Sequence, residues 1–96
     1  MRLVGRDLLR AFVREHPDSE PSLQRWAQAM EANRSRHFAD LRKTFATADY
    51  VRPFTIFNIA GNKYRLIALV DFGLQTVTVG AILTHEEYSG QEWRGR

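Results

Sequence analysis

The spacing of apolar residues changes halfway along the chain, and this change limits the possible folds more than any other feature. In the first half, sets such as Leu23, Trp26, Ala27 and Met30 recur at intervals of three and four, which is the spacing of one helix face. In the second half, β-branched and aromatic residues form short runs typical of strands. Helices followed by strands predict an α+β domain in which the helices pack on one face of a small sheet.

The pattern predicts three helices, then three strands, then one short helix. The helices are expected over residues 4–15, from Asp18 or Ser19 to Met30, and over 37–45. The strands are expected over 53–59, 63–72 and 76–84, joined by tight turns at Gly61-Asn62 and at 71–75 into an antiparallel meander. The middle strand is apolar on both faces, which favours a central place in the sheet. Thr84 and Glu87 have the spacing of a capping box, which predicts a short C-terminal helix.

Alternation along the strands predicts which side chains share a face. The third strand is expected to place Val77, Val79, Ala81 and Leu83 on one face. Lys63 and Arg65, two apart at the start of the middle strand, are expected to point to the same face. In a meander the third strand ends where the second began. Four side chains are therefore expected to converge at that end of the sheet: Lys63, Arg65, His85 and Tyr88.

Length and composition predict one domain, residues 1–96, in a reducing compartment. A chain of 96 residues can bury one core, since roughly 60–65% of the unfolded surface is buried at this size. The absence of cysteine excludes disulfides and thiolate metal sites. The charged N-terminal segment does not have the pattern of a signal peptide, and no apolar run has the length of a membrane span. A cytoplasmic protein without a membrane partner is expected.

Positive charge is concentrated in the middle third of the chain. The formal net charge is only +3, but residues 34–65 carry seven cations against two acids. A polyanionic partner such as nucleic acid is one explanation, and an ordinary solvated face is the other. The cations of this segment are Arg34, Arg36, Arg42, Lys43, Arg52, Lys63 and Arg65.

Several familiar kinds of site are absent from the sequence. There is no glycine-rich phosphate loop, no HExxH spacing among the three histidines and no nucleophile elbow. No set of carboxylates can be placed together to hold a metal, and no cofactor is expected. RNA can be cleaved without a metal, because its 2′-hydroxyl is an internal nucleophile. Such cleavage needs an acid, a base and cations on the phosphate, and histidine, tyrosine and arginine suit these tasks.

Each of these side chains also has an ordinary structural interpretation. His85 can support the start of a helix through a local hydrogen bond, and Tyr88 can be a packing residue. Arg65 can form a surface ion pair with Glu86 or Glu87, of the kind that contributes about 0–1 kcal/mol. Asn58 and Asn62 can simply be strand-end and turn residues.

The two strand-turn motifs carry a family resemblance. The segment "FTIFNIAGNKYRLIALVDF" contains Asn58, Gly61, Asn62 and Arg65 as N-x-x-G-N-x-x-R, and "VGAILTHEEY" ends in Thr84, His85, Glu87 and Tyr88. This arrangement, over roughly residues 37–89, resembles HigB-type toxins of bacterial type II toxin–antitoxin modules, within the RelE-like superfamily. The N-terminal helices match that family only in length and amphipathic pattern.

The resemblance implies a RelE-like fold and a ribosome-dependent mRNA interferase that cuts mRNA in the ribosomal A site. It implies a HigA-type helix-turn-helix antitoxin as partner, with DNA contacted only through the antitoxin complex. It assigns Arg65 to the scissile phosphate, Lys63 to the same or a neighbouring phosphate, His85 to general acid or base chemistry, and Tyr88 to stacking or proton transfer. The remaining RNA-binding candidates are Arg34, Arg36, Arg42, Lys43, Arg52, Asn58 and Asn62.

The chain departs from the family pattern at one position near the site. Ser89 stands where the family usually has aspartate after the tyrosine. If that aspartate orients the histidine or tyrosine, catalysis in this chain would be weaker or would use water instead. The alternative function is therefore a toxin that binds RNA or the ribosome without cleaving, or a protein-interaction module.

Overall fold

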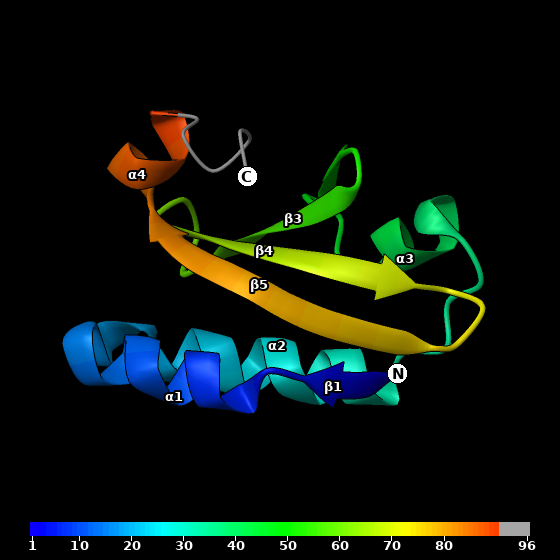
Figure 1. Ribbon diagram of the computed structural model, residues 1–96, viewed down its shortest axis with the longest axis horizontal. Coiled ribbons are helices and arrows are strands. Elements are labelled where there is room, and N and C mark those ends of the chain that lie inside the picture. Colours follow the sequence, from blue (N-terminus) through cyan, green and yellow to red (C-terminus); the bar gives the residue numbers. More distant parts are fainter. Residues whose placement is uncertain (91–96) are drawn as a thin grey trace.

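The computed structural model describes residues 1–90, which fold into a five-stranded sheet with the two N-terminal helices along one side of it (Figure 1). Its first half contains β1 (Arg2–Val4), α1 (Arg6–Glu15), the 3-10 turn η1 (Pro17–Ser19), α2 (Glu20–Ala32) and α3 (Phe38–Thr44). Its second half contains β2 (Asp49–Val51), β3 (Phe54–Ile59), β4 (Tyr64–Asp71), β5 (Thr76–Thr84) and α4 (His85–Ser89). The α+β class, the helices and the short C-terminal helix are therefore confirmed, with small shifts of boundary.

The sheet has the strand order β1-β5-β4-β3-β2, with the predicted meander β3-β4-β5 at its centre. The central position of β4 is confirmed, because it pairs antiparallel with both β3 and β5. The purely antiparallel sheet is wrong, because β1 pairs parallel with β5 and makes the sheet mixed. The short strands β1 and β2 were not predicted. Three-residue strands at the two edges carry too few residues to show an alternating pattern.

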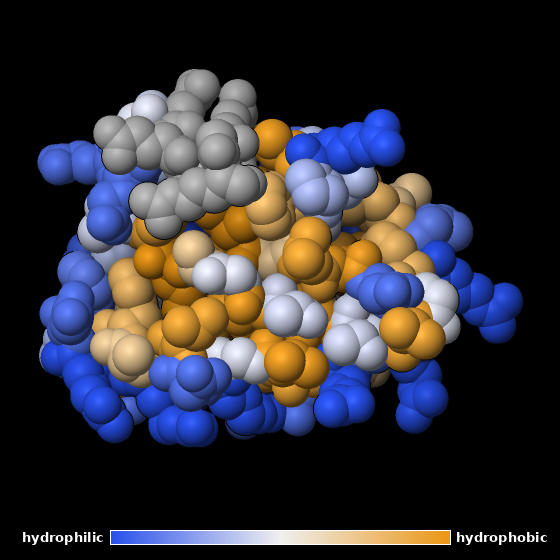
Figure 2. Space-filling model, viewed as in Figure 1, coloured by the Kyte–Doolittle hydropathy of each residue, from blue (hydrophilic) through white to orange (hydrophobic). Residues whose placement is uncertain are grey.

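The helix stripe predicted from the sequence forms the core. Leu23, Trp26, Ala27 and Met30 are all at most 6% exposed and pack toward the sheet. They pack against strand residues on the face of the sheet that is turned toward the helices. Among these strand residues are Phe57, Leu66, Ala68 and Val77. In the space-filling view, apolar side chains also gather over the strands at the centre, with hydrophilic ones over the helices below (Figure 2).

A bulge in β5 interrupts the alternation that the sequence predicts. Ala68 faces Val79 and Ile67 faces Ala81, so Gly80 is the extra residue between them. Beyond the bulge the pairing of Leu66 with Ile82 turns Ile82 toward the core. The prediction that Ala81 and Leu83 share the face of Val77 and Val79 is therefore wrong. A lone glycine inside a strand pattern is the signal that would have indicated a bulge.

The connection between β3 and β4 is longer than the predicted two-residue turn. Ile59 pairs with Tyr64, which leaves residues 60–63 as a four-residue loop, with Ala60 and Gly61 at φ 54° and 67°. The second connection, residues 72–75 between β4 and β5, lies where the sequence predicted it.

Gly5 and Gly61 both have positive φ, and their different surroundings predict different losses of stability on substitution by alanine. Gly5, between β1 and α1, has φ 103°, and a Cβ there would lie 3.0 Å from the Cβ of Val79; Gly61 has φ 67° and open space around it. Because Gly61→Ala adds only left-handed strain, we expect it to cost about 1–2 kcal/mol of unfolding free energy. Gly5→Ala adds a clash with β5, and we expect about 2–5 kcal/mol. Urea unfolding of the two variants checks this order, and equal losses would contradict it.

Candidate active site

One end of the sheet brings together the two sequence motifs. Tyr64 at the start of β4 pairs with Thr84 at the end of β5, and the backbone N–H of His85 donates to the carbonyl of Lys63 at 3.2 Å. The helix α4 begins at this point, beyond the end of β5 (Figure 1). The prediction that residue 84 lies beside residues 63–65 is confirmed.

Arg65 is the best-ordered cation of this end. Its guanidinium donates to the Asn62 carbonyl at 3.1 Å, to the Asn62 side-chain oxygen at 3.0 Å and to the Tyr64 carbonyl at 3.2 Å. It also lies over the Tyr88 ring, 5.6 Å from the ring centroid. The ion pair with Glu86 or Glu87, considered from the sequence, is not formed. Among residues 1–90 no carboxylate pairs with Arg65.

The asparagines of the motif stand next to Arg65 in different ways. Asn58 is directly opposite Arg65 across the β3–β4 pair, so the two side chains share one face of the sheet. Asn62 lies in the loop and holds the guanidinium through its carbonyl and its side chain. The loop interpretation of Asn62 is correct, and it also fixes the position of Arg65.

His85 and Tyr88 are carried by the capped first turn of α4. The Thr84 hydroxyl accepts from the Glu87 N–H at 3.2 Å, and the Glu87 carboxylate accepts from the Thr84 N–H at 2.9 Å, so the predicted capping box is confirmed. Residues three apart on a helix lie on the same side, which puts the exposed His85 and the half-buried Tyr88 on one face. Ser89 places its hydroxyl 3.5 Å from His85 Nδ1.

Lys63 does not lie in the strand with Arg65. It is the last residue of the loop, and its Nζ binds the Asp18 carboxylate at 2.6 Å. The prediction that Lys63 and Arg65 occupy one strand and share its face is wrong, because pairing begins only at Tyr64. The four side chains therefore do not converge as a single group. Arg65 contacts Tyr88, whereas Lys63 contacts η1 on the helix side of the sheet.

Asp18 ties the helix layer to the loop that carries the motif. Its carboxylate accepts from Lys63 and, at 2.9 Å, from the Tyr64 hydroxyl. The hydrogen bonds from Lys63 and Tyr64 hold the pKa of Asp18 below its usual range. Burial and the hydrogen bond to Asp18 raise the pKa of Tyr64. From the sequence, Asp18 was only a possible start of the second helix, and nothing in a single sequence indicates a contact with a residue 45 positions away.

Aromatic rings support the same anchor from the helix side. Tyr64 is 4% exposed and meets Phe12 edge-on, with ring centroids 5.0 Å apart. His16 stacks on Phe12 at 4.4 Å. Tyr64, the first residue of β4, is therefore fixed both by the packing of its ring and by the hydrogen bond of its hydroxyl.

The predicted RNA-binding cations form a separate group at the other end of the sheet. Arg42 and Lys43 lie in the last turn of α3, which is far from α4 in Figure 1. Lys43 is 3.5 Å from Asp40, and Arg42 donates to the Ala46 carbonyl. All five of these cations are exposed, namely Arg34, Arg36, Arg42, Lys43 and Arg52.

A metal-binding cluster and a membrane-spanning helix are both absent from the described part of the chain. Within residues 1–90 no three His, Asp or Glu side chains are grouped so that they could hold a metal ion. None of the helices in this range is both long and apolar enough to cross a membrane.

The chain is similar to known toxins over most of its length. Residues 19–91 match the HigB toxin family, a RelE-like toxic component of a toxin–antitoxin system. The chain belongs to this family. It is 24% identical over 91 residues to the mRNA interferase toxin HigB of Escherichia coli strain K12, covering 92% of this chain and 88% of that protein. The same values hold for the mRNA interferase HigB of Escherichia coli O157:H7 and of Shigella flexneri.

The Asp18 anchor makes a pH prediction. A carboxyl group with a lowered pKa in the folded state stabilises the fold above its unfolded pKa of about 4, and that contribution is lost as the pH falls through the folded pKa. We expect Asp18→Asn to lower the melting temperature at pH 7, with a difference from the unchanged chain that shrinks below about pH 4.

The control for this measurement is Asp49→Asn. Asp49 is an exposed residue of β2 that forms no ion pair within residues 1–90. Melting curves of both variants from pH 3 to about pH 8 give the comparison. A difference for Asp18→Asn that is constant over this range would contradict an electrostatic anchor.

Proposed function

We propose that this chain is the toxin of a type II toxin–antitoxin module and acts as a metal-independent mRNA endoribonuclease. Membership of the HigB family supports the toxin role, and the names of the relatives support mRNA cleavage. The observation that carries the proposal is the guanidinium of Arg65 over the Tyr88 ring, at the end of the sheet where His85 begins α4. The RelE-like description of the family supports assignment to that fold.

In the proposed reaction the substrate supplies its own nucleophile. The 2′-hydroxyl oxygen attacks the adjacent phosphorus, and the bond from phosphorus to the 5′-oxygen of the next nucleotide breaks. A base removes the proton from the 2′-hydroxyl, and an acid gives a proton to the leaving 5′-oxygen. The products are a 2′,3′-cyclic phosphate and a free 5′-hydroxyl. We assign His85 to one of the two proton transfers, since one nitrogen of an imidazole can accept a proton and the other can donate one.

The other groups of the site would bind and orient the RNA. Arg65 would stabilise the charge that develops on the phosphate, and its hydrogen bonds to Asn62 hold it in place before substrate binds. Tyr88 would stack on a base or assist proton transfer, and Asn58 would contact RNA beside Arg65. Lys63 would bind a neighbouring phosphate, in competition with Asp18, so we expect Lys63→Ala to reduce cleavage less than Arg65→Ala.

The cations near α3 would contact RNA far from the cleaved bond. Because these residues lie at the opposite end of the sheet from α4, one short RNA segment would not fill both places (Figure 1). An extended substrate, mRNA together with rRNA in the ribosomal A site, would reach both. On this proposal the chain acts in the cytoplasm, where mRNA is translated, and a HigA-type helix-turn-helix antitoxin neutralises it and contacts DNA.

A second candidate function rests on Ser89. A hydroxyl 3.5 Å from His85 Nδ1 orients an imidazole less strongly than a carboxylate would. The chain would then be a toxin that occupies RNA or the ribosome without cleaving it. Substitution of His85 separates the two functions.

The cleavage test is expression of His85→Gln and Arg65→Ala in bacteria, followed by mapping of mRNA 5′ ends. Loss of a proton-transfer group lowers a rate by about 10²–10⁴-fold, so we expect cuts within translated codons to disappear in His85→Gln. Arg65→Ala is expected to abolish cleavage similarly, because charge stabilisation of the phosphate is lost.

The matched control is His37→Gln at the start of α3, where glutamine can still accept from the Asp40 N–H. It should leave both cleavage and growth arrest unchanged. Growth arrest that persists in His85→Gln without new 5′ ends would refute the nuclease and favour the binding toxin.

Salt dependence tests the role of the cations near α3. Binding of single-stranded RNA releases counterions, so the logarithm of the affinity falls with the logarithm of salt, by about 0.7 for each phosphate contacted. We expect Arg42→Gln with Lys43→Gln to make this slope shallower by about 1.4. Filter binding of the purified protein to a single-stranded RNA, at salt concentrations from about 50 to about 300 mM, measures this slope. An unchanged slope would remove these two residues from the RNA surface.

A further inference from the structure

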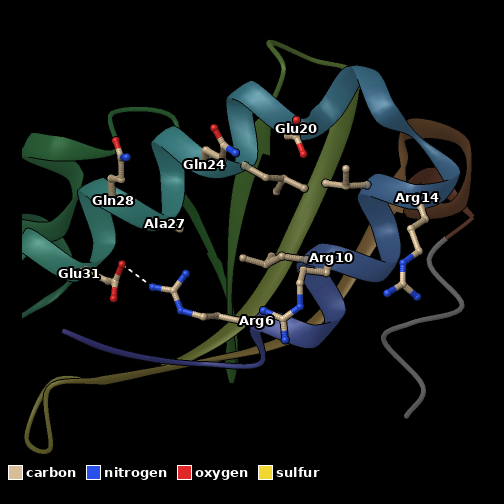
Figure 3. A pocket seen from close by; sticks show the side chains of 11 residues that line it. Arg6, Arg10, Arg14, Glu20, Gln24, Ala27, Gln28 and Glu31 are labelled. Atoms are coloured by element: carbon tan, nitrogen blue, oxygen red, sulfur yellow. Dashed lines mark ion pairs between the residues drawn. The ribbon is translucent and has the colours of Figure 1, made fainter.

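A groove lies between α1 and α2, away from the candidate active site. It has a volume of about 690 Å³. The two helices are joined by η1 and are linked again at their other ends by an ion pair between Arg6 and Glu31 (Figure 3). Its floor is made of apolar side chains, namely Leu9, Val13, Leu23 and Ala27.

One rim of the groove is a row of arginines. Arg6, Arg10 and Arg14 are spaced four residues apart on α1, so they lie on one side of the helix, about 6 Å from one to the next. Arg6 already binds a carboxylate across the groove. Within residues 1–90, Arg10 and Arg14 form no ion pair, and both are exposed. Within the described range, the row therefore presents two guanidinium groups without a carboxylate partner beside an apolar floor.

The opposite rim makes the groove a better match for a protein than for RNA. Gln24 and Gln28 line it, and their amides can hydrogen-bond a polypeptide. Glu20 and Glu31 also line the groove, and Glu31 is already paired with Arg6. None of the described residues that line the groove is aromatic, so nucleic acid would find no ring among them on which its bases could stack. An amphipathic polypeptide segment satisfies both the apolar floor and the arginines.

We infer that this groove is a docking site for an acidic amphipathic segment of the antitoxin. A toxin–antitoxin toxin must bind a protein partner, and the charge of the free rim selects for acidic residues. Two carboxylates at positions i and i+4 of a helix are also about 6 Å apart, which matches Arg10 and Arg14. Apolar residues on the same face of that segment would cover Leu9 and Ala27.

This site is separate from the proposed cleavage site. The groove lies on the helix layer, whereas Arg65 and Tyr88 meet at the junction of β4 with α4. Substitutions in the groove are therefore expected to change antitoxin binding and to leave toxicity intact. The inference rests on family membership and does not depend on whether the toxin cleaves RNA.

The test is charge reversal of the free rim, Arg10→Glu with Arg14→Glu, in the full-length chain. The probe is the purified antitoxin encoded in the same module, and calorimetry measures its affinity. Because like charges would then face each other across the interface, we expect affinity to fall at least about 100-fold. In cells, this variant should arrest growth even when the antitoxin is co-expressed.

The matched control reverses two exposed arginines outside the groove, Arg2→Glu with Arg25→Glu, for the same change in net charge. It should bind antitoxin with nearly unchanged affinity. Equal losses in both double variants would overturn the docking site, because they would indicate an effect of net charge alone. No loss in either would overturn it as well.

Two further measurements keep the inference testable if charge reversal impairs folding. A photo-crosslinking residue at position 28, on the α2 rim, should attach to the antitoxin, whereas the same residue at position 2 should not. Failure to cross-link from position 28 would overturn the proposal. Sedimentation of the toxin alone tests for a second copy in the groove, and self-association that depends on Arg10 and Arg14 would refute antitoxin docking. RNA affinity of the toxin tests for RNA in the groove, and an affinity that depends on the same two arginines would refute it as well.

Discussion

The bulge at Gly80 is the constraint on which the candidate site depends. With one extra residue in β5, Thr84 faces Tyr64 and Leu83 faces Arg65. A strand without the bulge would reverse the faces of every residue from Ala81 onward, because side chains alternate with a period of two. The chain would then enter α4 from the other side of the sheet. The contact between Arg65 and the Tyr88 ring follows from this one register shift.

The second requirement is an anchor for the loop that precedes β4. The loop has no regular pairing of its own, yet it supplies Asn62, which holds Arg65. Asp18 fixes it from the helix side through Lys63 and Tyr64, and the buried Tyr64 ring adds its contact with Phe12. The helix layer thereby positions a residue on the opposite side of the sheet. Lys63, which the sequence predicted as a phosphate-binding residue, thus also has a structural partner in Asp18.

A structural feature could be predicted from the sequence when its physical cause lies within one segment of the chain. The helix stripe of α2, the central place of β4 and the capping box at Thr84 each follow from spacing within one segment, and all three are confirmed. The parallel pairing of β1, the partner of Lys63 and the consequence of Gly80 each require knowing what lies across a gap in the chain. A single sequence contains no signal for the first two. For Gly80 the signal was present, as a glycine inside an alternating strand.

The distribution of charge shows why sums over sequence segments can mislead. Residues 1–33 carry five arginines and five acids and are neutral as a segment. In the structure three of those arginines lie along one rim of a groove on α1, and among residues 1–90 Arg6 is the one of the three that pairs with a carboxylate. Two surfaces of different chemistry result: exposed cations around α3, and arginines beside an apolar groove on the helix layer. On the two proposals above, the first would contact a phosphate backbone and the second an acidic polypeptide, so RNA and antitoxin would use different residues of one small domain.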